Sequence, residues 1–311
     1  MNEDALERVT RRLPPGSLDA LAALPGADLT TAMLEIARRR AERSTAADVL
    51  RRYGQDRFVR PAEVDAASIR LVERRLFGGL PSGFEEVALA PLTPIGTHRL
   101  AGVAQSRLLT TDRANEVAAD PTNALALEAA IRRRALMRSD PRSSEAVRLA
   151  ASQRVVRAQR FEDEASFAHF QLFGFLTAGR DTGNLAFERD AFATHLRFLA
   201  ETVGSLTGLV VRLTLTALSG PRMEPLLEAV AGVFSSDDRV EVAHDPDREA
   251  GRDYYEGACF KVHVLRTDDE PLEVADGGFV NWTQQLLASR KERLLIGGIG
   301  VERLTLSRGT R

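Results

Sequence analysis

The segment LIGGIGVERL, residues 295–304, combines features that could bind a nucleotide. Gly297, Gly298 and Gly300 stand in an otherwise apolar run that ends at Arg303. Because glycine has no Cβ, a flat ring such as adenine can come close to a strand that contains it. The planar guanidinium of arginine can stack on such a ring or hold a phosphate with two hydrogen bonds. The alternative interpretation is a glycine-rich core strand followed by a solvated arginine.

From RAQRFEDE to LFGFLTA, residues 157–178, period-two apolar content predicts two strands around a polar loop, and this stretch overlaps a second arginine segment, residues 154–175. It resembles motif 2 of the class II aminoacyl-tRNA synthetases, and the glycine segment resembles their motif 3. The resemblance places Arg157 at the α-phosphate of ATP, where charge develops as a carboxylate attacks the phosphorus. It implies Arg157 and Arg303 as catalytic residues. The nucleotide-binding residues that it implies are Arg157, Gln159, Gly298, Gly300 and Arg303.

Within this class, the order of segments over about residues 65–305 is similar to histidyl-tRNA synthetase and to the regulatory subunit of ATP phosphoribosyltransferase. The helix expected at 65–77 and the strand ending at Pro91 resemble motif 1, which implies a homodimer. Residues ADPT, 119–122, take the place of the family's binding segment for the substrate ammonium. The substrate-binding residues that the resemblance implies are Asp120, Thr122, Gln171, Tyr254, Tyr255, Gly277 and Gly278.

Several positions depart from the family pattern. Ala250 stands where the family has a catalytic arginine, and Gln159 replaces the motif 2 glutamate. Phe175 falls on the carboxylate that reads the imidazole ring. A buried imidazole N–H without a partner would cost about 1–3 kcal/mol. We therefore expect the pocket to take an apolar ligand, or none, rather than histidine.

The elements that must position these residues are readable from the periodicity of the sequence. Expected helices cover residues 65–77, 122–137, 186–204, 224–234 and 281–289. Expected strands cover residues 83–91, 209–218, 239–243, 257–265 and 272–276, and residues 295–304 are expected to run from a last strand into a helix or turn. Runs of strands with segregated helices predict an α+β fold with a mostly antiparallel sheet flanked by helices.

Residues 1–62 are expected to form a small helical N-terminal region, and residues 63–311 the synthetase-like core. Residues TAAD, 45–48, resemble a capping box that opens a short helix. The residues of this helix that are expected to face inward are Val49, Leu50 and Tyr53.

Composition limits the class of protein. The chain has 311 residues, a net charge of −2 and 44% hydrophobic residues, which is typical of a globular protein. Such a charge does not favour broad binding to nucleic acid or anionic membrane, and the arginines at 38–40 and 132–134 are expected to be solvated. Cys259 is the only cysteine, so no internal disulfide can form and a buried thiol in a reducing cytoplasm is expected. We recognise no secretion signal and no membrane span.

Two functions fit these observations. In the first, the protein binds ATP with Mg²⁺ and a small amino acid, and forms an aminoacyl adenylate for a non-standard acceptor or carrier. Full tRNA recognition is not expected, because no anticodon-binding domain is recognised. In the second, the protein is a non-catalytic regulatory or ligand-sensing paralogue that docks on a partner enzyme. Neither function calls for a protein-bound metal, and the five histidines show no metal-binding spacing.

Overall fold

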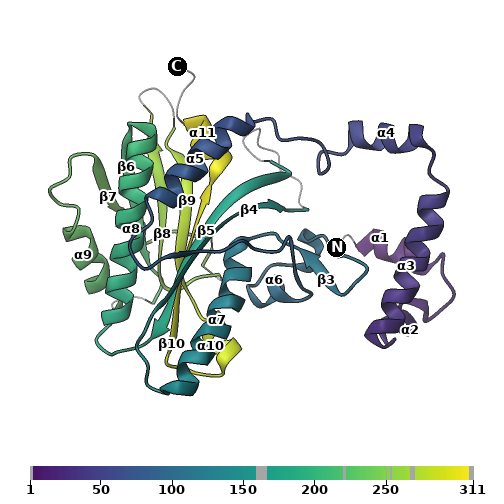
Figure 1. Cartoon of the computed structure of the whole chain (residues 1–311), viewed down its shortest axis with the longest axis horizontal. Coiled ribbons are helices and arrows are strands. Elements are labelled where there is room, and N and C mark those ends of the chain that lie inside the picture. Colours follow the sequence, from purple (N-terminus) through teal and green to yellow (C-terminus); the bar gives the residue numbers. More distant parts are fainter. Residues whose placement is uncertain are drawn as a thin grey trace.

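The computed structural model describes residues 3–158, 167–219, 222–249, 251–252, 254–266 and 270–307. Within these residues an eight-stranded sheet forms the centre of the molecule (Figure 1). In spatial order its strands are β1 (Glu85–Glu86), β4 (Val147–Val156), β5 (His169–Arg180), β10 (Glu292–Gly300), β9 (Leu272–Val280), β8 (Glu256–Leu265), β6 (Val210–Ala217) and β7 (Val240–His244). A separate antiparallel pair consists of β2 (Leu92–Pro94) and β3 (Asn115–Val117).

The pairing within the large sheet is antiparallel except at its two edges, where β1–β4 and β6–β7 are parallel. The predicted α+β fold with a mostly antiparallel sheet is therefore confirmed. The predicted strand at 83–91 is wrong for most of its length, because only Glu85 and Glu86 form ladder pairs with β4. Beyond them, the Val87 N–H donates to the carbonyl of Ala150, and the side chain of Gln153 on β4 donates to the carbonyl of Ala90 at 2.6 Å.

Helices cover both faces of the sheet (Figure 1). The larger apolar core lies under α5 (Ala66–Gly78), α8 (Ala186–Thr207), α9 (Glu224–Gly232) and α11 (Val301–Ser307). The opposite face packs against α7 (Pro121–Ser139) and α10 (Trp282–Leu287), with the short α6 (Thr97–Leu100) and the 3₁₀ turn η1 (Gln105–Arg107) beside them. The helices predicted at 65–77, 122–137, 186–204, 224–234 and 281–289 are thus confirmed. Asp65 begins α5 by accepting a hydrogen bond from the Ser68 N–H, and Gly79 ends it.

The N-terminal helices lie apart from the sheet (Figure 1). They are α1 (Glu3–Thr10), α2 (Ser17–Ala22), α3 (Gly26–Glu42) and α4 (Ala46–Gln55). The capping box of Thr45 and Asp48 is present at the start of α4. The expected inward orientation of three side chains is wrong, since Val49, Leu50 and Tyr53 are 59%, 71% and 46% exposed. No residue of α4 is buried, so helical spacing alone was not sufficient to predict burial.

Cys259 on β8 is fully buried, as expected, and burial raises the pKa of its thiol. No helix among the described residues is both long and apolar enough to cross a membrane.

His195, on α8, makes the stability of the fold dependent on pH. Its ring is buried, and its Nε2 lies 2.9 Å from Thr177 Oγ1. Burial lowers the pKa of His195 from 6.5 to about 3. Between pH 6.5 and about 3, His195 is therefore protonated in the unfolded chain but stays neutral in the folded protein. The free energy of unfolding is unaffected by this group above that pH, and falls by about 1.4 kcal/mol per unit as the pH drops towards 3.

Urea denaturation between neutral and mildly acidic pH measures this dependence. We expect His195→Gln to flatten the curve of unfolding free energy against pH by about one proton. His244→Gln, which changes an exposed histidine, serves as the control and should leave the slope unchanged. Parallel curves for wild type and His195→Gln would contradict the assignment.

Candidate functional site

A cavity of about 500 Å³ opens between β5, β10, β9 and the start of α7. Side chains and backbone from widely separated segments meet in it. Among the described residues its walls include Val103, Arg107, Ala119, Asp120, Thr122, Arg157, Phe167, Phe170, Leu172, Gly251, Tyr254, Tyr255, Glu273, Val274, Ala275, Asp276, Ile296, Gly297, Gly298, Gly300, Glu302 and Arg303. Arg157 and Arg303, far apart in sequence, thus face one hollow.

Arg157 follows β4 and lies over an aromatic wall. Its Cζ lies 5.2 Å from the centroid of the Phe170 ring, a cation–π distance. Its Nε donates to the Ala119 carbonyl at 3.2 Å, and its Nη2 is 3.3 Å from Asp120 Oδ2. The side chain keeps 37% of its surface exposed, so the guanidinium can also reach an anion in the cavity.

Arg303 lies in the first turn of α11, directly after β10. Nη1 makes its hydrogen bond to the Glu273 carbonyl, and this bond is long at 3.4 Å. Above Gly298 the cavity is open, since an added Cβ would meet nothing closer than Leu172 Cδ1 at 3.7 Å. At Gly300 the nearest atoms belong to Arg303 itself, at 3.6 Å. Gly298 and Arg303 therefore frame a space that a flat ring can enter.

Gly297, directly before Gly298 on β10, serves packing instead. A Cβ there would stand 2.4 Å from Phe175 Cζ, on the other face of the sheet. Neighbouring residues of a strand point to opposite faces of the sheet, so Gly297 and Gly298 have different roles. The glycine-rich segment thus makes room for the Phe175 ring on one face of the sheet and leaves the cavity open on the other.

Asp120 and Thr122 lie where α7 begins. Asp120 Oδ1 accepts hydrogen bonds from the Thr122 N–H at 2.9 Å and from its hydroxyl at 2.7 Å, and so caps the helix. The other carboxylate oxygen faces Arg157. Both residues line the cavity, but Asp120 has partners at both oxygens and is not an open site for an ammonium group.

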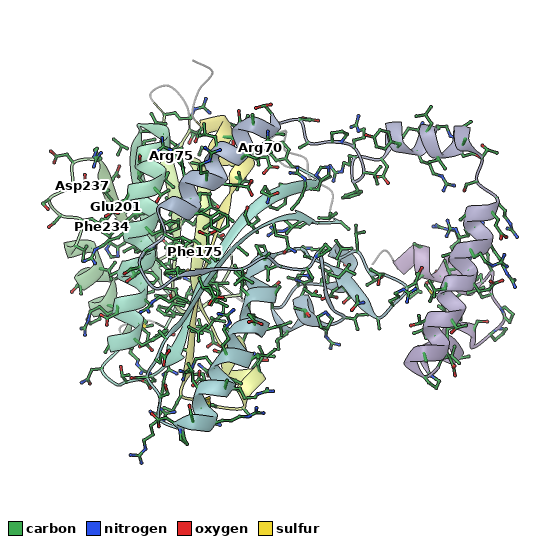
Figure 2. The ribbon with its side chains drawn as sticks, in the orientation of Figure 1. Arg70, Arg75, Phe175, Glu201, Phe234 and Asp237 are labelled. Atoms are coloured by element: carbon green, nitrogen blue, oxygen red, sulfur yellow. The ribbon has the colours of Figure 1, made fainter. Side chains whose placement is uncertain are left out.

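The expected positions of Gln171 and Phe175 need correction. Gln171 Nε2 donates to Glu73 on α5 and to Ser152 Oγ, both at 3.0 Å, away from the cavity. Phe175 is fully buried between the sheet and α8, its ring centroid 4.7 Å from that of His195 (Figure 2). Side chains on a strand alternate between faces, so a shift of one residue moves them to the other side.

Phe170 and Leu172 are the β5 residues that line the cavity. Gly174 shares their face and packs under α7, because a Cβ there would stand 2.8 Å from Pro121 Cγ. The expected preference for an apolar ligand rested on Phe175, and it has no support once that ring is placed outside the cavity.

The glycine pair of β9 also acts through packing. A Cβ on Gly277 would stand 2.3 Å from Phe260 Cζ, and one on Gly278 would stand 2.7 Å from Tyr255 Cδ1. Neither glycine lines the cavity, contrary to their expected role as substrate contacts. Gly278 instead lets the Tyr255 ring lie flat against the sheet. Tyr254 and Tyr255 do line the cavity, and burial raises the pKa of both phenols, which keeps them protonated.

Two expected positions, Gln159 and Ala250, lie outside the described residues. The sequence interpretation missed Arg107, Phe170 and Asp276, which line the cavity. For Asp276 a signal was available, because an acid inside the apolar strand VADGGFV is costly to bury without a purpose.

A metal centre made of protein side chains is not present in the described part of the chain, where no three His, Cys, Asp or Glu residues are placed to hold an ion. Mg²⁺ commonly enters such sites with nucleotide phosphates and one or two carboxylates. Glu302 and Glu273 line the cavity, but Glu302 pairs with Arg154 at 3.0 Å and Glu273 with Lys261 at 2.8 Å.

No protein-family profile matches this sequence, and no curated protein matches it. Solved structures do match its fold. The histidyl-tRNA synthetase of S. aureus is 16% identical with a TM-score of 0.58, and the match covers 78% of this chain but 64% of that one. An ATP phosphoribosyltransferase regulatory subunit/histidyl-tRNA synthetase from Bacillus halodurans is 13% identical with a TM-score of 0.55, covering 80% and 82%.

A histidine–tRNA ligase subunit from Alicyclobacillus acidocaldarius is 15% identical with a TM-score of 0.56, and that match covers 80% of this chain and 96% of the other. Of the S. aureus synthetase, by contrast, the chain spans less than two thirds of the length. The predicted likeness in fold is confirmed by all three structures. This chain has a class II aminoacyl-tRNA synthetase-like fold, similar to that of histidyl-tRNA synthetase and of the ATP phosphoribosyltransferase regulatory subunit.

Proposed function

We propose that the cavity binds ATP with Mg²⁺ and a small amino acid, and joins them as an aminoacyl adenylate. The observation that carries the proposal is the convergence of Arg157 and Arg303 on one cavity, with the open position of Gly298 between them. Arg303 and Phe170 would hold the adenine ring from two sides, and Arg157 would hold the α-phosphate. Mg²⁺ would enter with the phosphates and neutralise part of their charge.

In the proposed reaction a carboxylate oxygen of the amino acid forms a bond to the α-phosphorus. The bond from that phosphorus to the bridging oxygen breaks, and pyrophosphate leaves with the electron pair. Arg157 would stabilise the charge that develops on the phosphoryl oxygens. The acyl group would then pass to an acceptor other than a normally decoded tRNA. The homodimer expected from the motif 1-like segment belongs to the same proposal.

Calorimetric titration with ATP and Mg²⁺ tests the nucleotide site. We expect Arg303→Ala to weaken ATP binding by about ten-fold or more, because a hydrogen bond to a charged group is lost together with ring stacking. Arg290→Ala removes an exposed arginine outside the cavity and should change nothing. ATP binding that is absent in the wild type, or equal in all three proteins, would remove the proposal.

Catalysis is tested by pyrophosphate exchange with each standard amino acid at millimolar concentration. Exchange that depends on one amino acid and on Arg157 supports adenylate formation. Binding of ATP without exchange for any amino acid would favour the second function, a ligand-sensing module that docks on a partner enzyme.

That second function has its own support in the fold. Asp120, expected to hold the ammonium, is paired with Arg157, and Gln171 faces away from the cavity. Apolar side chains on the N-terminal helices are exposed, among them Leu34, Ile36 and Leu50. A module that docks on a partner needs such a surface, whereas adenylate formation does not.

A further inference from the structure

Among the described residues four carboxylates line the cavity, and three of them form ion pairs with basic side chains. Asp120 pairs with Arg157 at 3.3 Å, Glu273 with Lys261 at 2.8 Å, and Glu302 with Arg154 at 3.0 Å. The fourth is Asp276 on β9. Among the described residues no basic side chain forms an ion pair with it. Its one hydrogen bond there comes from the Tyr255 hydroxyl, which donates to Oδ2 at 3.0 Å.

Asp276 is held in place by its position in β9 and by Tyr255. It lies opposite Gly298 in the β9–β10 register, beside the open floor of the cavity. Tyr255 fixes one carboxylate oxygen, and Gly278 makes room for the Tyr255 ring against the sheet. The second oxygen belongs to a side chain that lines the cavity and has no such partner among the described residues. The carboxylate is thus positioned before any ligand arrives.

A half-buried carboxylate without an ion-pair partner lowers the stability of the empty protein. A charge taken out of water costs free energy unless a counter-charge accompanies it. Burial, and next the charge of Glu273, raise the pKa of Asp276, and the Tyr255 hydrogen bond and the charge of Arg248 offset only part of that rise. A group that opposes folding and is nevertheless rigidly placed is typical of a binding site.

We propose that Asp276 binds the ammonium group of the amino acid substrate, in place of Asp120. This assignment rests on the proposed function and deepens it. The ligand is then a zwitterion whose cation lies at Asp276 and whose carboxylate faces the arginine side of the cavity. Glu273, whose carbonyl accepts from Arg303, and Asp276 are three residues apart on β9, or about 10 Å at the rise of a strand. This span leaves room for a small amino acid between Asp276 and the Arg303 side of the cavity.

The test measures amino-acid binding separately from ATP binding. Each standard amino acid is titrated into the full chain by calorimetry, with Mg²⁺ and α,β-methylene-ATP present so that no adenylate can form. We expect at least one amino acid to bind and its N-acetyl derivative, which has no ammonium charge, to fail. Asp276→Asn should weaken that binding by about ten-fold or more.

Asp276→Asn keeps the size of the side chain and an acceptor for Tyr255, so it is expected to fold. Its free energy of unfolding without ligand should equal or exceed that of the wild type, because a half-buried charge without an ion pair is removed. Its affinity for ATP should be unchanged, which separates this assignment from the nucleotide site. Glu273→Gln, the matched control, changes a carboxylate of the same cavity that is already paired and should weaken amino-acid binding less.

The assignment is overturned if no amino acid binds, if the N-acetyl derivative binds equally well, or if Asp276→Asn retains full affinity. An equal loss in Glu273→Gln would also overturn it, since the effect would then come from the charge of the cavity as a whole. In each of these cases normal ATP binding leaves the nucleotide part of the proposed function standing. Absence of ATP binding in the wild type removes the proposed function itself.

Discussion

Replacing Glu292 with glutamine is expected to lower the free energy of unfolding by about 3–5 kcal/mol. Glu292 begins β10 and forms a two-bond ion pair with Arg133 of α7, at 2.8 and 3.0 Å, and both side chains are fully buried. Arg133 also donates to the carbonyls of Glu145 and Ser143. It thus ties a helix, a loop and a central strand together. Glutamine would leave the buried guanidinium without a counter-charge.

The neighbouring arginine provides a matched control. Arg132 on the same helix pairs with Glu85, whose side chain is 60% exposed. Water and salt screen such a pair, so Glu85→Gln should change stability far less than Glu292→Gln. Both variants are compared by urea denaturation at neutral pH. The double variant Arg133→Met/Glu292→Leu should cost less than Glu292→Gln alone, because no buried charge remains. Equal effects of the two glutamine variants would contradict the role of the buried pair.

The second large effect concerns the two adjacent glycines of β10. Gly297→Ala is expected to lower the free energy of unfolding by about 1–3 kcal/mol, since its Cβ would lie 2.4 Å from a ring atom of Phe175. That ring is fully buried, and Phe173, His195 and Phe198 pack around it. Gly298→Ala adds the same methyl group one residue later, where the nearest atom is 3.7 Å away, and should leave stability almost unchanged.

For ATP affinity we expect the opposite ranking of the two variants. The methyl group of Gly298→Ala projects into the floor of the cavity, where we propose that the adenine ring approaches the strand. ATP affinity measured by calorimetry should therefore fall in Gly298→Ala, whereas Gly297→Ala, as long as it is folded, should bind ATP normally. Equal stability of the two variants would show that the Phe175 ring can shift to accommodate the added methyl group. Unchanged ATP affinity in Gly298→Ala would place the ring elsewhere in the cavity.

The sequence by itself was sufficient for the order and type of most elements. The period of apolar residues marked the helices at 122–137 and 186–204, and the last strand running into α11, within a few residues of their observed bounds. Such patterns indicate which face of a helix or strand is buried, and they can be recognised without knowing what that face packs against. The likeness of ordered segments to class II synthetases then fixed the fold, which the solved structures confirm.

Tertiary structure decided which side chains share a face and which charges are paired. Residues 132–134 form a uniform run of arginines that we expected to be solvated, but the structure buries Arg133 and leaves Arg132 partly exposed. The predicted strand at 83–91 has only a short pairing with β4, because strand formation depends on a partner as well as on the alternation of its own residues.

The site shows the same division. The sequence indicated that Arg157, Arg303 and Gly298 could serve one nucleotide, and the structure places them around one cavity. It could not show that Gln171 faces α5, because a strand shifted by one residue reverses every side chain without changing the apolar pattern. Nor could it show that Asp276 forms no ion pair within the described part of the chain, since pairing depends on residues that come together only when the sheet forms. Local patterns determine the elements, and long-range packing determines which of their side chains are left to bind.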